Sequence, residues 1–86
     1  MIKIVFRPIF FRHYNKLPKS LQEEVKEKIG LFRENPKHPF LKTHKLKGHL
    51  KDAFSFSVNY KYRVVFYFKT KNVAVFLGVG DHDVYR

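Results

Sequence analysis

The sequence contains no cysteine. A disulfide framework and a zinc site built on thiolates are therefore excluded, and one reason to place the chain outside a reducing cytoplasm is removed. No apolar run approaches the roughly 20 residues needed to span a bilayer. The apolar N-terminus is interrupted by Lys3, Arg7 and Pro8 and lacks the small-residue cleavage site of a signal peptide. We therefore expect a cytoplasmic chain with no membrane contact.

Acidic residues are also scarce. Asp and Glu total 7 against 18 Lys and Arg, which gives a formal net charge of +11. This balance indicates a polyanionic partner, nucleic acid first and an acidic protein segment second. A disordered basic tail is excluded, because 44% of the residues are hydrophobic and 10 Phe and 5 Tyr are present. A chain of 86 residues predicts a single domain over 1–86.

The charge is unevenly spread along the chain. All four glutamates lie between Glu23 and Glu34, whereas the range 37–51 holds five lysines, three histidines and no acid. Such a run can be a solvated face that keeps a small protein in solution, or a strip that binds phosphates. The histidines between the lysines favour the phosphate-binding strip.

Two helices are predicted in the first half of the chain, after a short strand over 2–6. A short helix over 11–17 ends before Pro18, because the residue before a proline disfavours the helical region. A longer helix is indicated by an apolar stripe with helical spacing. It consists of Leu17, Leu21, Val25, Ile29 and Phe32. Ser20 to Glu23 fits a capping box at its start, and Asn35-Pro36 ends it.

The second half changes to the two-residue period of strands. Residues 53–58 alternate, with Phe54 and Phe56 on one face and Ser55 and Ser57 on the other. Further strands are predicted over 62–68, over 73–79, which we expect to be central and buried on both faces, and briefly over 43–46. The order predicts an α+β domain: an N-terminal strand, two helices, then a three- to four-stranded, mainly antiparallel sheet with the helices packed on one face.

Arg63 interrupts an otherwise apolar strand. Because an unpaired buried charge is costly, its guanidinium must reach water, a carboxylate or a phosphate. One interpretation is an ion pair with Asp52 or with an aspartate of the C-terminal tail. The other, which we favour, is a side chain that faces a ligand, since the planar guanidinium matches two phosphate oxygens.

The C-terminus turns polar directly after the last predicted strand. Such an end can be a frayed tail. However, His82 and Tyr85 are residues that transfer protons, and Asp81 and Asp83 flank the imidazole and can orient it. We therefore treat His82 and Tyr85 as candidate catalytic residues.

A third group of functional side chains lies before Gly48. His44, Lys45, Lys47 and His49 are close together, and on a strand His44 and Leu46 share a face opposite Lys45 and Lys47. Metal binding is the competing interpretation, but no histidine pair has the helical spacing of a zinc protease and no Cys or Glu lies near. We expect neither a metal nor a small-molecule cofactor.

Four motifs in the same order resemble the RelE/ParE toxin superfamily, and the likeness is greatest to its RelE/StbE and YafQ-like members. They are Lys16-Leu17-Pro18 before the long helix, the segment His44 to Gly48, the strand Tyr62 to Phe66, and the ending Gly80 to Tyr85. The resemblance covers nearly the whole chain. It implies a toxin of a type II toxin–antitoxin pair. RelE-like members are endoribonucleases that cut mRNA in the ribosomal A site, whereas ParE-like members poison DNA gyrase.

The resemblance also implies roles for individual residues. Arg63 matches the strand arginine that contacts the scissile phosphate, and His82 and Tyr85 match the C-terminal histidine and aromatic residue of the ribonucleases. His44 matches a histidine that YafQ-like members carry before the Leu-x-Gly turn. Ser55 and Ser57 depart from the pattern, because RelE has lysines on this strand.

These matches imply a metal-independent cleavage of mRNA on the ribosome. Arg63, His82, Tyr85 and His44 are its catalytic candidates, and a cognate antitoxin protein is its partner. The strip implies RNA contacts by Lys42, Lys45, Lys47, His49 and Lys51. Two alternatives remain open: a non-catalytic gyrase-inhibiting toxin, and an inactive basic domain that only binds its antitoxin.

Overall fold

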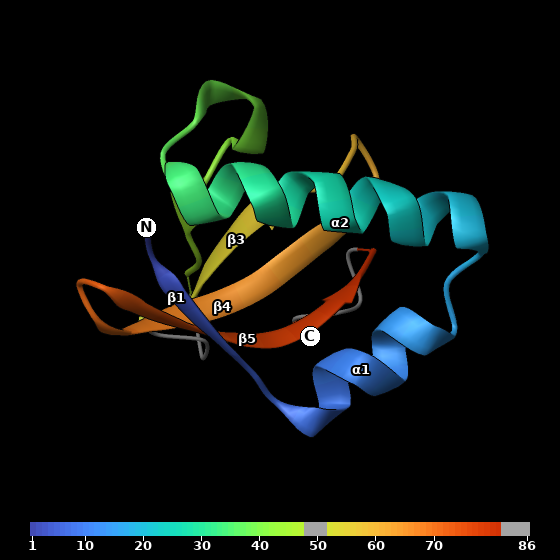
Figure 1. Ribbon diagram of the computed structural model, residues 1–86, viewed down its shortest axis with the longest axis horizontal. Helices are drawn as coiled ribbons and strands as arrows, with labels where there is room; N and C mark the ends of the chain where they lie inside the picture. The colour runs from blue at the N-terminus through green and yellow to red at the C-terminus, as the bar shows by residue number, and fades with distance from the viewer. Residues whose placement is uncertain (48–51, 82–86) are drawn as a thin grey trace.

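The computed structural model describes residues 1–47 and 52–81. Five strands form one sheet in the order β1-β5-β4-β3-β2, with β1 parallel to β5 and every other pair antiparallel. Helix α2 lies in front of the sheet in Figure 1, and Phe10 of α1 packs in the same core cluster as the buried residues of α2. The predicted α+β class, with helices on one face of a mainly antiparallel sheet, is confirmed. The elements in chain order are β1 (Lys3–Phe6), α1 (Pro8–Asn15), α2 (Lys19–Glu34), the 3₁₀ helix η1 (Pro39–Leu41), β2 (His44–Lys45), β3 (Phe54–Ser57), β4 (Arg63–Thr70) and β5 (Val73–Gly80).

The helix starts differ from the sequence prediction. Helix α1 begins at Pro8, because a proline without an N–H is well suited to the first helical turn. The predicted capping box of Ser20 and Glu23 is wrong: Pro18 occupies the N-cap of α2, and no side chain caps the helix. Instead, the Gln22 amide donates hydrogen bonds to the carbonyls of Tyr14 and Leu17, at 2.9 and 3.2 Å, and so ties the end of α1 to α2.

Strand β5 is an interior strand, as the apolar run predicts, but β4 holds the middle position of the sheet. The sheet has one strand more than predicted, because β1 adds to the far side of β5 in parallel. A bulge separates two parts of the β4–β5 pairing, since Phe66 pairs with Phe76 but Val65 pairs with Gly78. The extra residue, Leu77, bends β5 and increases its twist.

The main core lies between the helices and the sheet. The predicted stripe of α2 is buried at Leu21, Val25, Ile29 and Phe32. The ring of Phe32 is fully buried and lies 4.9 to 5.3 Å from the rings of Phe56, Phe66 and Phe76. One of these pairs is stacked and two are edge-on, and aromatic pairs at these distances stabilise beyond the area that they bury.

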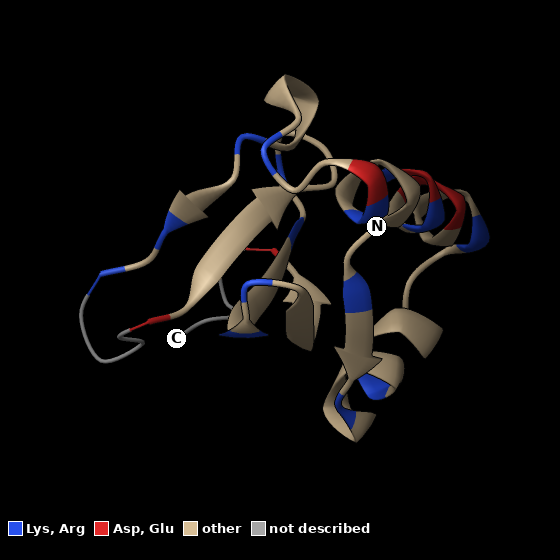
Figure 2. Ribbon diagram, turned by 60° about the vertical axis from the view of Figure 1, so that its left-hand side comes forward, with Lys and Arg blue, Asp and Glu red and all other residues tan. Residues whose placement is uncertain are grey.

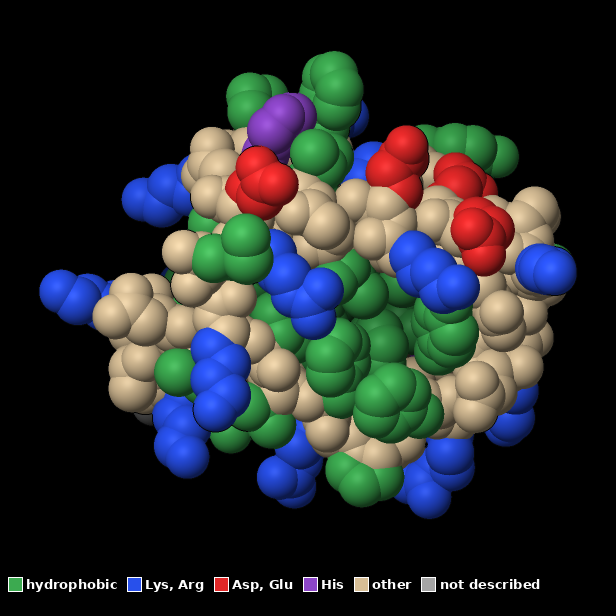
Figure 3. Space-filling view, viewed as in Figure 1, with side chains coloured by type: hydrophobic (Ala, Val, Ile, Leu, Met, Phe, Trp, Pro, Cys, Tyr) green, Lys and Arg blue, Asp and Glu red, His purple; other side chains and the backbone are tan. Residues whose placement is uncertain are grey.

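The helix side also carries hydrophobic side chains on its surface. Figure 3 shows them gathered below α2, with acidic side chains along that helix. Phe11 of α1 is 48% exposed although its ring lies 5.3 Å from that of Phe6. No helix in the described part of the chain is long and apolar enough to cross a membrane.

The other face of the sheet carries only a small apolar cluster. Leu46, Ala53 and Val65 are buried there, with Leu77 packed against them. This face, which we call the open face, also holds polar and charged side chains that the sequence singled out, among them His44, Ser55, Ser57 and Arg63.

Candidate functional site

The register of the strands places the candidate residues in two rows on the open face. In the first row His44 pairs with Ser55, Ser55 with Val65, and Val65 with Gly78. In the second row Ser57 pairs with Arg63, and Arg63 with Gly80. Glycine carries no side chain at either end position on β5, and serine is short. The short side chains of Ser55 and Ser57 therefore lie between His44 and Arg63, and the glycines lie on β5 beyond Val65 and Arg63.

His44 is held at both ring nitrogens. Its Nδ1 lies 3.0 Å from the carbonyl oxygen of Lys42, and its Nε2 lies 3.4 Å from Oγ of Ser55. A carbonyl can only accept, so Nδ1 carries the proton in this arrangement and the neutral ring has its lone pair on Nε2. Ser55 is fully buried, whereas His44 is exposed. The result is an exposed imidazole whose acceptor nitrogen, Nε2, lies beside the Ser55 hydroxyl.

The contact below His44 depends on an unusual backbone at Lys42. This residue caps η1 in the left-handed region, with φ 50° and ψ 42°. For a residue with a side chain this conformation costs about 1 kcal/mol. The loop is held by the Thr43 hydroxyl, which donates a 2.7 Å hydrogen bond to the Pro36 carbonyl. The strained turn thus brings the Lys42 carbonyl to Nδ1 of His44.

Arg63, the first residue of β4, is half-buried. Within the described ranges its Nε is buried and has no hydrogen-bond partner. Leaving a buried donor unpaired costs about 1–3 kcal/mol, and more when the group is charged. The proposed pairing with Asp52 is not formed, because the Asp52 carboxylate lies 4.0 Å from Lys45 Nζ on the surface. Arg63 therefore keeps one donor without a partner among the described residues.

His44 and Arg63 lie diagonally across β3. Two strand spacings of about 4.8 Å and a two-residue offset of about 3.3 Å each separate their Cα atoms by roughly 12 Å. Only Ser55 and Ser57 of β3 lie between them on this face. The two candidate side chains therefore lie on one face, with the short side chains of Ser55 and Ser57 between them.

The structure places the remaining predicted residues as follows. Lys42, Lys45 and Lys47 are exposed, and basic residues follow the loop and strand that lead to β3 in Figure 2, while most acids lie on α2. His49, Lys51, His82 and Tyr85 lie outside the described residues. Because Gly80 is the register partner of Arg63, the described chain ends beside Arg63.

His13 is a structural contributor that the sequence did not reveal. Its Nδ1 accepts a 3.2 Å hydrogen bond from the backbone N–H of Val79, so α1 caps a donor of β5 beyond the end of β1. Burial, followed by the charges of Lys16 and Arg12, lowers the pKa of His13 from its ordinary value of 6.5. The contact joins residues 66 positions apart, and no local pattern signals it.

No three His, Asp or Glu side chains gather to hold an ion within residues 1–47 and 52–81. The candidate side chains are one imidazole, one guanidinium and surrounding lysines, which can bind a phosphodiester and move protons.

No protein-family model and no curated protein sequence matches this chain. Solved structures do match. The YafQ structure from E. coli strain BL21(DE3) is 17% identical with a TM-score of 0.80, over 99% of this chain and 98% of that one. A chain of the toxin–antitoxin complex RelBE2 from Mycobacterium tuberculosis is 22% identical with a TM-score of 0.78, over 94% and 98%. The YoeB/ParE toxin from Agrobacterium tumefaciens is 16% identical with a TM-score of 0.77, over 94% and 99%.

These similarities confirm the resemblance at the level of the fold. Nearly the whole chain superposes on nearly the whole of each relative, so the order of strands and helices is shared from end to end. Fold alone does not assign an activity, which depends on the side chains of the site.

Proposed function

We propose that this chain is the toxin of a type II toxin–antitoxin pair and that it is a metal-independent endoribonuclease acting on mRNA on the ribosome. The fold supports the proposal, because it is the fold of toxins such as YafQ. The observation that carries the chemistry is the pair on the open face: a held imidazole at His44 and, across β3, a guanidinium at Arg63 with a buried, unpaired Nε.

In this proposal the RNA supplies its own nucleophile. A base removes the proton from the ribose 2′-OH, and the oxygen attacks the adjacent phosphorus. The bond from phosphorus to the 5′-oxygen breaks, and an acid protonates that oxygen as it leaves. The products are a 2′,3′-cyclic phosphate and a 5′-OH. Water and metal take no part in this step, so EDTA leaves it intact once the magnesium that ribosomes need is supplied.

Each catalytic candidate has a defined task. Arg63 stabilises the charge that builds on the phosphate oxygens. His44 and His82 handle the two protons, and the contact of Nδ1 with the Lys42 carbonyl puts the lone pair of the neutral His44 ring on Nε2, beside the Ser55 hydroxyl, where it acts as the base. Tyr85 positions or stacks a base. RNA phosphates are gripped by Lys42, Lys45, Lys47, His49 and Lys51.

The proposal includes an antitoxin and a cytoplasmic site of action. A free toxin harms its own cell, so a separately encoded protein must cover the site. The structure of RelBE2 is that of a toxin–antitoxin complex. We propose that an acidic or amphipathic segment of such a partner covers Arg63 and the basic strip, with an association that weakens as salt screens the charges.

One observation favours the alternative functions. Ser55 and Ser57 stand where RelE has lysines, and Ser55 is fully buried, so β3 offers no cationic side chain to the open face. A gyrase inhibitor or an inactive antitoxin-binding domain needs no such chemistry, and one matching structure is described as a YoeB/ParE toxin.

The deciding experiment compares the two targets directly. The protein is incubated with mRNA-programmed ribosomes and, separately, with gyrase and supercoiled DNA. The ribonuclease proposal expects mRNA cut at defined positions and unchanged gyrase activity. Inhibited gyrase with intact mRNA identifies the alternative toxin, and no change in either leaves the inactive binding domain.

A further inference from the structure

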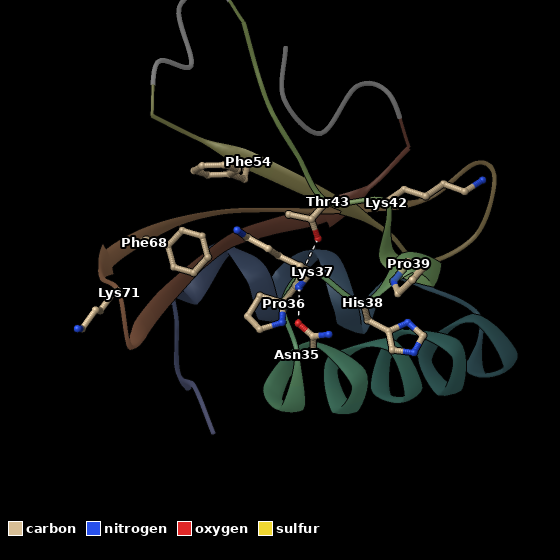
Figure 4. A pocket seen from close by; sticks show the side chains of 10 residues that line it. All are labelled: Asn35, Pro36, Lys37, His38, Pro39, Lys42, Thr43, Phe54, Phe68 and Lys71. Carbon is tan, nitrogen blue, oxygen red and sulfur yellow. Dashed lines mark hydrogen bonds between the residues drawn. The ribbon is translucent and has the colours of Figure 1, made fainter.

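A groove of about 780 Å³ lies on the helix side of the sheet. The edge strand β2 separates this groove from the open face. Phe54 of β3 and Phe68 of β4 form its apolar floor, and the loop between α2 and β2 forms its wall, as Figure 4 shows. The lining is completed by Asn35, Pro36, Lys37, His38, Pro39, Lys42, Thr43 and Lys71.

The floor is incompletely covered by the chain itself. Phe54 and Phe68 are half-buried, whereas their neighbour Phe66 is fully buried. Phe54 stacks on Phe66 with ring centroids 5.7 Å apart, and Phe68 meets Phe54 edge-on at 5.5 Å. Apolar surface therefore remains open to a ligand at the end of the aromatic core.

Hydrogen bonds within the loop between α2 and β2 hold the wall of the groove in place. Oδ1 of Asn35 accepts a 3.0 Å hydrogen bond from the Lys37 N–H, and the Thr43 hydroxyl donates to the Pro36 carbonyl. Nδ1 of His38 accepts from the Phe40 N–H at 3.1 Å. Since these polar atoms are already paired, the groove recognises a ligand through apolar contact and through charge.

The charge of the groove has one sign. Lys37, Lys42 and Lys71 are exposed at its margin, and its lining residues include no Asp or Glu. An apolar side chain flanked by carboxylates complements this surface, because it fills the floor while its acids meet the lysines.

We propose that this groove is the docking site for an acidic segment of the antitoxin that carries a bulky apolar side chain. The inference rests on the proposed function, because the antitoxin exists only if the chain is such a toxin. A protein segment is favoured over RNA because one face of the Phe54 ring is already stacked on Phe66, and because Asn35 Oδ1, His38 Nδ1 and the Thr43 hydroxyl are already paired within the loop. Base recognition needs free ring faces or free hydrogen-bonding groups.

The groove adjoins the candidate site through one residue. Lys42 lines the groove, and its carbonyl holds Nδ1 of His44 on the other side of β2. Because β2 is the last strand of the sheet, a partner can pass around its edge from the groove to the open face. One antitoxin segment can therefore occupy the groove and cover His44 together.

The test uses the full-length chain and the protein encoded by the adjacent open reading frame. Lys37→Glu/Lys71→Glu reverses two charges of the groove margin. Lys3→Glu/Lys19→Glu is the matched control, because it changes the net charge equally at exposed positions outside the groove. We expect the groove variant to weaken the complex about tenfold or more and to flatten its salt dependence, while the control changes affinity by about threefold or less.

The outcomes separate this inference from the proposed function. If both double variants bind alike, the groove is not the docking site, although the toxin–antitoxin pair stands. If the unchanged chain does not bind the adjacent protein at all, the proposed partner fails and the inference fails with it. If only ribosome or RNA binding falls in the groove variant, the groove is a nucleic-acid site and the inference is overturned.

The lack of cysteine permits a second readout of position. Lys71→Cys gives a chain with one thiol at the groove margin, in the turn between β4 and β5. We expect its alkylation to slow at least about tenfold in the complex, because the docked segment covers it. Unchanged alkylation in a saturated complex contradicts the inference.

Discussion

The two faces of the sheet carry different kinds of side chain. On the helix side, fully buried Phe32, Phe56, Phe66 and Phe76 pack ring against ring. On the open face the same strands present Ser55, Ser57 and Arg63, with only a small apolar cluster beside them. Alternation along a strand lets one segment serve both sides. Stability is therefore concentrated on the helix side, and the open face can hold polar groups that stability alone does not favour.

The largest effect on stability is expected in the aromatic core on the helix side of the sheet. Phe32→Ala removes a ring that contacts three others and leaves a cavity. We expect the free energy of unfolding to fall by about 3–5 kcal/mol, measured by urea denaturation. Phe40→Ala is the control, since Phe40 is 70% exposed and its removal changes stability by about 0.5 kcal/mol or less. A small loss for Phe32→Ala shows that the core is not where stability resides.

The second effect concerns Arg63 on the open face. We expect Arg63→Ala to lower the rate of mRNA cleavage about 10²–10³-fold, the scale for removing one preorganised group that stabilises charge. Its melting temperature stays the same or rises, because the variant no longer buries an unpaired Nε. Lys69→Ala, an exposed position on the same strand, controls for loss of positive charge. A severe drop in melting temperature with normal cleavage makes Arg63 a structural ion-pair residue instead.

A smaller effect is expected from Ser55, which touches His44 but no proposed substrate atom. Ser55→Ala removes the hydroxyl at 3.4 Å from Nε2 and loosens the ring. We expect kcat to fall about tenfold with KM unchanged, because the proton acceptor is less well placed. Ser57→Ala removes a hydroxyl from the same strand and face, but its register partner is Arg63. Equal effects of the two variants on kcat contradict the positioning role.

The smallest effect is a dependence of stability on pH through His13. Above pH 6.5 the ring is neutral in the folded and unfolded states, so its hydrogen bond from Val79 is fully kept. Below pH 6.5 the unfolded chain takes up the proton first, because the pKa of His13 is lowered in the folded chain. The free energy of unfolding therefore declines as the pH falls from 6.5 toward the folded pKa.

His13→Asn isolates this contribution. The Asn Oδ1 can accept from the Val79 N–H at the position of Nδ1, but it does not titrate. Urea denaturation of both proteins at neutral pH and at about pH 5 measures the difference. We expect a shallower acidic decline for the variant. Identical declines show that the contact does not respond to protonation.

The sequence predicts those features that depend on local pattern. The buried stripe from Leu21 to Phe32 follows from helical spacing, and the two faces of β3 follow from the alternation around Ser55. The side of the sheet on which His44 lies is predicted in the same way, from the alternation along the short strand β2. These features depend on the period of the side chains, which the sequence displays directly.

Contacts between segments that are distant in the sequence cannot be predicted from the local pattern of side chains. Nothing near His13 indicates Val79, and nothing near His44 indicates the hydroxyl of Ser55. The left-handed turn at Lys42 is also hidden, because a lysine seldom adopts it. The capping box failed for a local reason: Pro18 fixes its own φ at −57° and starts the helix before Ser20 can cap it.

A single 2′-deoxy nucleotide in the mRNA tests whether the open face cleaves RNA through the ribose 2′-OH. A defined mRNA is placed on ribosomes with a single 2′-deoxy nucleotide at the mapped cut position, beside an all-ribose control, and Arg63→Ala controls for contaminating nuclease. The account predicts that the all-ribose mRNA yields a 2′,3′-cyclic phosphate and a 5′-OH while the deoxy mRNA stays intact at that position. Cleavage of the deoxy mRNA there, or products ending in a 5′-phosphate, contradicts it.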